Sequence, residues 1–178
     1  GRHVLVEKPM CLTPREADEI IAARDAAGVQ VMVAYMRRFA PAFTEAVEQV
    51  RQLEKINYAR VRDIIGQNAL IIEQATDIHR FDDIPEAAKA DRTERAKALV
   101  TEAIGEAPPE LVRAYRMMLG LGSHDLSAMR ELIGAPQRVI AASSWNGGSF
   151  MAALLAFDGF NATFEMGVDR QRRFDAHL

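Results

Sequence analysis

The stretch VLVEKPMCLTPREADEIIAARDAAGVQVMVAY, residues 4–35, decides the fold of the first part of this chain. Its first apolar run predicts a buried strand over residues 3–8. Thr13-Pro14-Arg15-Glu16 is a capping box with proline at the first helical position, and it predicts a helix that ends at Gly28. Residues 29–35 (VQVMVAY) predict a second strand. A strand, a helix of about four turns and a strand form a βαβ unit, so we expect the two strands to be parallel neighbours.

The rest of the chain changes from helical to strand periodicity. Helices are predicted over 41–53, 85–105, 108–118 and 123–133, with a strand over 58–66 between the first two, while 68–84 is left open. Three strands then follow, at 136–145, 149–157 and 160–168, joined by Asn146-Gly147-Gly148 and Asp158-Gly159. These two turns are typical of hairpins, so the last third should be an antiparallel meander with no further strand after it. The fold class is therefore α/β to α+β: a parallel βαβ piece, then an α+β region with a mostly antiparallel open sheet.

Composition excludes several classes of protein. The chain has 178 residues, of which 49% are hydrophobic and 26% charged, and its net charge of −3 argues against a nucleic-acid partner. No apolar run approaches the roughly 20 residues of a membrane span, so we expect no membrane partner either. The single cysteine, Cys11, fits a reducing compartment, here the cytoplasm, and we expect it to be unreactive.

Polar residues follow both strands of the predicted βαβ unit. Glu7-Lys8-Pro9 ends the first strand, and Tyr35-Met36-Arg37-Arg38-Phe39 follows the second. Ligands of open α/β sheets bind beyond the carboxyl ends of the strands, and parallel strands open on the same edge. Pro9 restrains Lys8, so Lys8 is either a held functional lysine or a solvated residue at a strand end.

The second candidate is His124, in the stretch GLGSHDLSAM. Gly120-Leu121-Gly122 follows helical sequence, so it is not predicted to be a phosphate-binding loop. A helix starting near Ser123 would place His124 in its first turn, where the helix dipole favours a neutral imidazole that can accept a proton. The alternative is a histidine that only packs the helix. No histidine or cysteine spacing is typical of a metal site, so none is predicted.

Three stretches resemble one family: residues 4–43, containing Glu-Lys-Pro and MRRF; residues 120–136, GLGSHDLSAMRELIGAP; and residues 160–178. Together they resemble the Gfo/Idh/MocA oxidoreductases, in particular the inositol 2-dehydrogenase-like enzymes. The resemblance implies that residues 1–38 are the last βαβ piece of a dinucleotide-binding Rossmann domain. Residues 39–178 would be an incomplete C-terminal substrate and oligomerisation domain.

The resemblance also implies roles for individual residues. Lys8 and His124 would be catalytic, with His124 as the base that accepts the hydroxyl proton. Cofactor contacts are implied for Glu7, Lys8 and Pro9, and substrate contacts for Lys8, Met36, Arg37, Arg38 and His124. The cofactor would be NAD or NADP, although the Gly-x-Gly-x-x-Gly unit that binds most of it is expected to lie outside this chain. Many relatives carry an aspartate four residues before the histidine, where this chain has Gly120.

The implied function is hydride transfer between a nicotinamide and a cyclic polyol, sugar or related hydroxy compound. We expect the chain to be a partial one that is inactive alone and to form homo-oligomers through sheet faces or edges. Two alternatives stay open: a non-catalytic binding or oligomerisation module on the same fold, and a family reductase with a different substrate.

Overall fold

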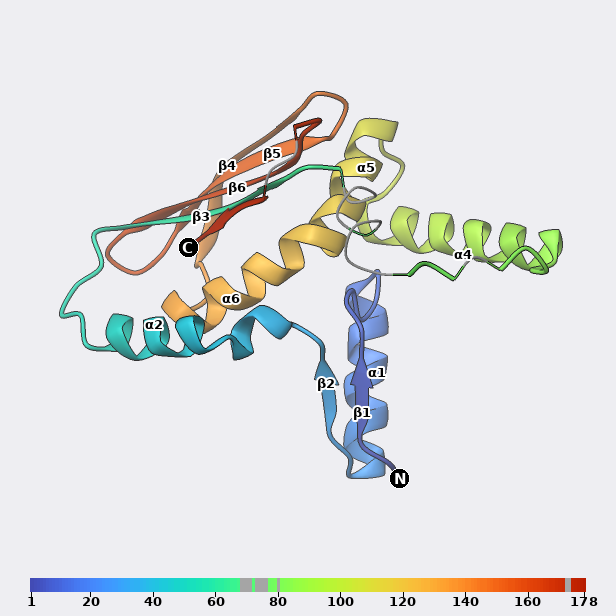
Figure 1. Ribbon diagram of the computed structural model, residues 1–178, viewed down its shortest axis with the longest axis horizontal. Coiled ribbons are helices and arrows are strands. Elements are labelled where there is room, and N and C mark those ends of the chain that lie inside the picture. The colour runs from blue at the N-terminus through green and yellow to red at the C-terminus, as the bar shows by residue number, and fades with distance from the viewer. Residues whose placement is uncertain (68–71, 73–76, 80, 172–173) are drawn as a thin grey trace. The chain divides into compact units, whose positions relative to one another are not determined.

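The structure is a computed structural model that describes residues 1–67, 72, 77–79, 81–171 and 174–178. The chain divides into two compact units, whose helices and strands are labelled in Figure 1. The first unit comprises residues 1–34 and 68–108, and the second comprises residues 35–67 and 109–178. The stretch 68–84, left open by the sequence, lies mostly outside the described residues.

The first unit contains the predicted βαβ arrangement. Its elements are β1 (Val4–Val6), α1 (Pro14–Ala27), β2 (Val31–Val33) and α4 (Glu86–Ile104). The strands β1 and β2 pair in parallel, with Leu5 opposite Met32. The capping box is present, because the Thr13 side chain accepts from the Glu16 amide and the Glu16 carboxylate accepts from the Thr13 amide. Gly28 ends α1 in the left-handed conformation, as predicted.

The prediction that the first strand is buried is wrong for this chain. Leu5 is 69% exposed, and Val4 and Met32 are also exposed. A strand in a parallel sheet is buried only when both faces of the sheet are covered and further strands flank it. Among the described residues β1 and β2 form a sheet of two strands, so apolar sequence alone does not produce burial here.

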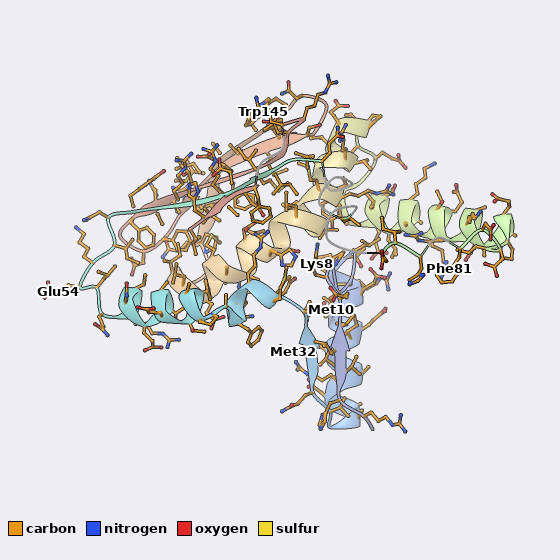
Figure 2. The ribbon with its side chains drawn as sticks, in the orientation of Figure 1. Lys8, Met10, Met32, Glu54, Phe81 and Trp145 are labelled. Carbon is orange, nitrogen blue, oxygen red and sulfur yellow. The ribbon has the colours of Figure 1, made fainter. Side chains whose placement is uncertain are left out.

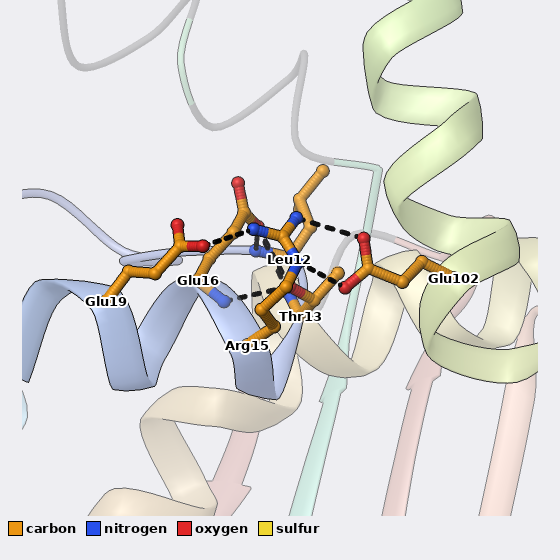
Figure 3. A network of polar contacts seen from close by, with 6 residues as sticks. All are labelled: Leu12, Thr13, Arg15, Glu16, Glu19 and Glu102. Atoms are coloured by element: carbon orange, nitrogen blue, oxygen red, sulfur yellow. Dashed lines mark hydrogen bonds and ion pairs between the residues drawn. The ribbon is translucent and has the colours of Figure 1, made fainter.

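The polar helix α4 is joined to α1 by an exposed ion network (Figure 3). Arg15 is its centre: the guanidinium donates to Glu102 on α4 at 2.8 and 2.9 Å and to Glu19 at 2.7 Å. These carboxylates raise the pKa of Arg15 further above its usual value. The network lies beside the Thr13 and Glu16 cap, so the same first turn of α1 carries both features.

The second unit is a five-stranded sheet with helices packed on one face. Its elements are η1 (Met36–Phe39), α2 (Pro41–Arg51), β3 (Tyr58–Ile65), α5 (Pro109–Met117), η2 (Met118–Gly122), α6 (Ser123–Ile133), β4 (Arg138–Trp145), β5 (Phe150–Ala156), β6 (Asn161–Val168) and β7 (Phe174–His177). The strand order is β4-β5-β6-β3-β7. The predicted meander of β4, β5 and β6 is confirmed, with antiparallel pairing throughout.

One strand of this sheet differs from the sequence-based prediction, and one pairing was left open by it. A fourth C-terminal strand, β7, follows the meander and pairs antiparallel with β3. The strand β3 itself pairs in parallel with β6, so Val61 lies opposite Phe164. Both pairings join segments far apart in sequence, and local turn signals carry no information about such partners.

The core lies between the sheet and α6. Met129 from α6 packs against Val61, Phe164 and Met166 of the sheet, and all four side chains are at least 97% buried. Gly122 makes this packing possible, because a Cβ there would lie 2.8 Å from the Met166 sulfur. The Gly120-Leu121-Gly122 segment is therefore a helical packing element, in agreement with the prediction that it is not a phosphate loop.

Candidate functional site

The Glu-Lys-Pro segment directly follows β1 in the first unit. Figure 2 shows Lys8 at the carboxyl end of this strand. Lys8 is half-buried, whereas Glu7 and Pro9 are exposed, and the Lys8–Pro9 peptide bond is cis. Because β1 and β2 are parallel, their carboxyl ends open on one edge, as predicted. Glu7, Lys8 and Pro9 therefore lie at this edge, and their cofactor contacts stay predictions.

His124 lies in the second unit, 4% exposed, in a continuous helical run. The prediction of a free helix N-terminus at this point is wrong. The helix α5 passes through the π-helical turn η2 into α6, and Gly122, just before α6, has the right-handed helical φ and ψ of −61° and −23°. The backbone amide of His124 thus lies in the interior of this helical run. The helix dipole therefore gives no reason for a neutral imidazole here.

The imidazole is held instead by an aromatic contact. The ring of Tyr35 meets His124 edge to face, with the ring centroids 5.9 Å apart and an interplanar angle of 78°. Tyr35 immediately precedes η1, while His124 belongs to α6. This contact places the start of the MRRF segment against the candidate base, and π-helical turns such as the adjacent η2 are frequent at functional sites.

Beside His124 in sequence, Asp125 belongs to a buried ion cluster. One nitrogen of Arg37, Nη1, donates to Asp63 Oδ2 at 2.7 Å and to Asp125 Oδ1 at 2.6 Å. Asp63 is fully buried and Asp125 is 7% exposed. The guanidinium of Arg37 also lies 5.2 Å from the centroid of the Phe174 ring. The cluster therefore joins η1, β3, α6 and β7 through a single arginine.

Two buried carboxylates share this one cation, and the electrostatic consequence falls on Asp125. Its pKa is raised to about 7, first by burial and next by the charge of Asp63, while Arg37 acts in the lowering direction. Within the described part of the chain, the outer oxygens Asp63 Oδ1 and Asp125 Oδ2 have no hydrogen-bond partner. An oxygen without a donor is the natural place for a proton, so near neutral pH the cluster can hold or release one.

The other residues of the MRRF segment differ in their surroundings. Arg38 forms a close ion pair with Glu131 of α6 through Nε, and its Nη1 lies 3.5 Å from the Ser127 hydroxyl. Met36 is exposed. Substrate contacts of Met36, Arg37 and Arg38 stay predictions, and both arginines already bind carboxylates of their own unit.

Cysteine and metal chemistry add little to this site. Burial, and next the nearby Glu16, raise the pKa of the Cys11 thiol, which lowers its thiolate fraction. The described residues contain no group of three or more His, Cys, Asp or Glu side chains placed to hold a metal ion. Of the helices described, none is long and apolar enough to cross a bilayer.

Asp63 is the site residue that sequence reasoning missed. It lies in the strand YARVRDII, two residues from both Val61 and Ile65, which share its face of the sheet. A single acidic residue on the apolar face of a strand predicts a buried charge that needs a partner. The sequence does not predict which residues meet Asp63, because Arg37 is 26 residues away and Asp125 is 62 residues away.

Comparison with known proteins supports the resemblance. Residues 1–35 match the sequence model of the Gfo/Idh/MocA oxidoreductase family, described as having an NAD-binding Rossmann fold. No curated protein matches the chain.

Solved structures share the fold at low sequence identity. The scyllo-inositol dehydrogenase of Lactobacillus casei with bound NAD(H) and scyllo-inositol is 19% identical, with a TM-score of 0.62 over 97% of this chain and 46% of its own. The myo-inositol 2-dehydrogenase of Lactobacillus plantarum is 20% identical, with a TM-score of 0.62 over 98% and 46%. The WlbA dehydrogenase of Thermus thermophilus in complex with NAD and UDP-GlcNAcA is 17% identical, with a TM-score of 0.60 over 94% and 43%.

This chain thus spans less than half the length of these dehydrogenases. The mixed α/β fold with a mostly antiparallel sheet is the fold that was predicted, and it is shared over nearly the whole chain. The predicted resemblance to the Gfo/Idh/MocA oxidoreductase family is confirmed by sequence over residues 1–35, and over the rest of the chain the solved structures show a shared fold.

Proposed function

We propose that the protein containing this chain is an NAD(P)-dependent dehydrogenase that moves a hydride between the nicotinamide and a cyclic polyol, sugar or related hydroxy compound. The observation that carries the proposal is Glu7-Lys8-Pro9 at the carboxyl end of β1, inside the segment that matches an NAD-binding oxidoreductase family. Residues 1–38 serve in this proposal as the end of the dinucleotide-binding domain, and residues 39–178 as the substrate domain.

The fit to a nicotinamide cofactor is partial. The edge at Glu7, Lys8 and Pro9 suits the nicotinamide end, because it is the ligand-binding end of a parallel strand pair. The Gly-x-Gly segment at Gly120 is helical, so it does not supply a phosphate loop. When bound, the nicotinamide would supply the hydride chemistry. Tight cofactor binding by this chain alone is therefore not expected.

The protein residues would position the substrate and handle its proton. In this proposal the Lys8 ammonium donates a hydrogen bond to the reacting hydroxyl, and the imidazole of His124 accepts the hydroxyl proton as general base. Tyr35 orients the imidazole through the edge-to-face contact. The cluster of Arg37, Asp63 and Asp125 holds η1 against α6, so that Tyr35 and His124 keep their geometry.

A turnover assay tests this function. The chain is assayed alone and together with its flanking coding sequence, with NAD+ and NADP+ and a panel of polyols and sugars, by following nicotinamide absorbance. Lys8→Met and His124→Ala should each lower turnover by about 10²–10⁴-fold, the range for acid/base groups. Arg113→Gln, an exposed position on α5, should have no effect. Turnover within about threefold of wild type in either active-site variant would remove that residue from the mechanism, and no activity with any polyol or sugar would favour the reductase alternative.

A non-catalytic oligomerisation module is the second candidate, favoured by the open face of the sheet. Over β4, β5 and β6 this face has an apolar hollow of about 520 Å³, where the Trp145 and Phe150 rings stack 5.9 Å apart. Trp145, labelled in Figure 2, is 45% exposed. Exposed apolar faces of this kind typically mark protein interfaces, so a homodimer through this face is compatible with either function. Analytical ultracentrifugation of wild type and Trp145→Lys would show whether such a dimer forms.

A further inference from the structure

A polar groove in the second unit is lined by positively charged side chains that have no common role in the proposed reaction. It has a volume of about 750 Å³ and lies where η1, the end of α2 and α6 meet. Three arginines, Arg38, Arg51 and Arg130, line it together with a single carboxylate, Glu131. These three arginines come from three separate elements, so the folding of the second unit gathers them.

The pairing of the three arginines leaves a net positive charge. Arg38 is neutralised by Glu131. Among the residues that the structure describes, Arg51 pairs only with Glu48 on its own helix, at 2.8 Å, and both side chains are more than 60% exposed. Such an exposed pair is weak and exchanges readily for another anion. Arg130 is exposed and forms no ion pair with any described residue.

The geometry suits an oxyanion. Glu131 engages Nε of Arg38, and Nη1 of the same side chain lies 3.5 Å from the Ser127 hydroxyl, so this guanidinium is fixed at the groove. Guanidinium groups bind carboxylate and phosphate oxygens through two parallel hydrogen bonds. The Ser127 hydroxyl, which also lines the groove, adds a neutral hydrogen-bonding group.

Tyr35 connects this groove to the candidate base. Its side chain lines the groove and its ring also contacts His124, at 5.9 Å between centroids. A molecule anchored in the groove by an anionic group would therefore lie beside the residue that orients His124.

We propose that this groove binds the carboxylate or phosphate group of a small-molecule substrate, so that the preferred substrates are acidic or phosphorylated sugars and not neutral polyols. The proposal rests on the proposed dehydrogenase function for the role of the bound molecule as substrate. The groove itself requires only that an anion binds at Arg130 and its neighbours.

Binding to the chain as it exists here can be measured by isothermal titration calorimetry at low and high salt. The probes are glucuronate, glucose 6-phosphate, neutral glucose and inorganic phosphate. At least one charged sugar should bind about tenfold or more tightly than glucose, should lose affinity in high salt, and should be displaced by inorganic phosphate. Preference for glucuronate identifies a carboxylate ligand, and preference for glucose 6-phosphate identifies a phosphate ligand.

The variant Arg130→Gln removes the exposed arginine without breaking an ion pair, so it should leave the unfolding transition unchanged. It should weaken binding of the charged sugar about tenfold, the effect of one charge-assisted hydrogen bond. The matched control is Arg113→Gln, at an exposed α5 position that does not line the groove, and it should bind like wild type. The proposal would be overturned by any of three results. Glucose could bind as tightly as the charged sugars, neither charged sugar could bind, or Arg130→Gln could bind the charged sugar as tightly as wild type.

This outcome is separable from that of the dehydrogenase assay. Anion binding that depends on Arg130, with no turnover of any compound, would retain the groove and reject the proposed function. Turnover of neutral polyols, with no binding of either charged sugar that depends on Arg130, would retain the function and reject the groove.

Discussion

The two units use the same kind of ion cluster in opposite environments. In the first unit, Arg15 binds Glu19 and Glu102 on the surface, where all three side chains are well exposed to water. In the second unit, Arg37 binds Asp63 and Asp125 in the interior, where both carboxylates are buried. Both clusters place one arginine between two carboxylates at distances below 3 Å.

The two clusters differ in how much hydration their carboxylates have lost. Exposed carboxylates keep their hydration, so the contacts of Arg15 contribute little beyond local order. Buried carboxylates have lost that hydration and depend on Arg37. The pKa of Asp125 shifts toward neutral pH first because of burial and next because of the charge of Asp63, which Arg37 only partly offsets. Of these two clusters, the interior one is therefore the one whose charge can change near neutral pH.

The largest expected effect comes from removing the buried cation. Arg37→Leu should lower the free energy of unfolding by about 3–5 kcal/mol, because it leaves two uncompensated buried carboxylates. Urea denaturation measures this loss, and Arg113→Leu, on an exposed helix face, is the matched control. The triple variant Arg37→Leu, Asp63→Leu, Asp125→Asn should recover a large part of the loss. A single variant as stable as wild type would mean that the cluster is solvated.

An intermediate effect is expected from the pH dependence of Asp125. Its folded-state pKa of about 7 lies above the ordinary value of 3.8, so the protonated form is favoured in the fold. The stability from this group is complete below about pH 4 and is lost as the pH rises to about 7. Relative to wild type, Asp125→Asn should therefore gain stability across this window by more than about 1.4 kcal/mol, the free energy of one pKa unit.

Unfolding midpoints at several pH values measure this difference. Asp158→Asn, in the exposed turn after β5, is the control, and its difference from wild type should be constant with pH. A constant difference for Asp125→Asn as well would show that Asp125 is ionised throughout the window.

The smallest effect is expected at the surface cluster. Arg15→Gln should lower the thermal midpoint by no more than about 2 °C, and high salt should reduce even this change, since exposed ion pairs are weak and screened. Circular dichroism thermal melts at low and high salt provide the measurement. A drop comparable with that of Arg37→Leu would contradict the distinction between the two clusters.

The predictions from sequence succeeded where local chemistry is sufficient. The capping box at Thr13 and Glu16, the left-handed Gly28 and the hairpin turns each involve residues within a few positions of one another. These signals located the βαβ unit and the meander correctly.

The predictions failed where distant segments decide. The sequence around Ser123 suggested a helix start, but α5 continues through the π-helical turn η2 into α6, with Gly122 close to Met166. The exposure of Leu5 depends on which elements cover β1. The pairing of β7 with β3 depends on two segments that are far apart in sequence. None of these outcomes is encoded within a single window of sequence.

By itself, the sequence determined the order of the elements as far as β6 outside residues 68–84, the Glu-Lys-Pro segment at a strand end and the family resemblance, because each depends on neighbours along the chain. Only the tertiary structure decided that Arg37 bridges Asp63 and Asp125, that Tyr35 contacts His124, and that three arginines share one groove. The physical reason is that burial and charge compensation depend on which residues meet in space. Packing between the sheet and α6 decides which residues come into contact, and their spacing in the chain does not.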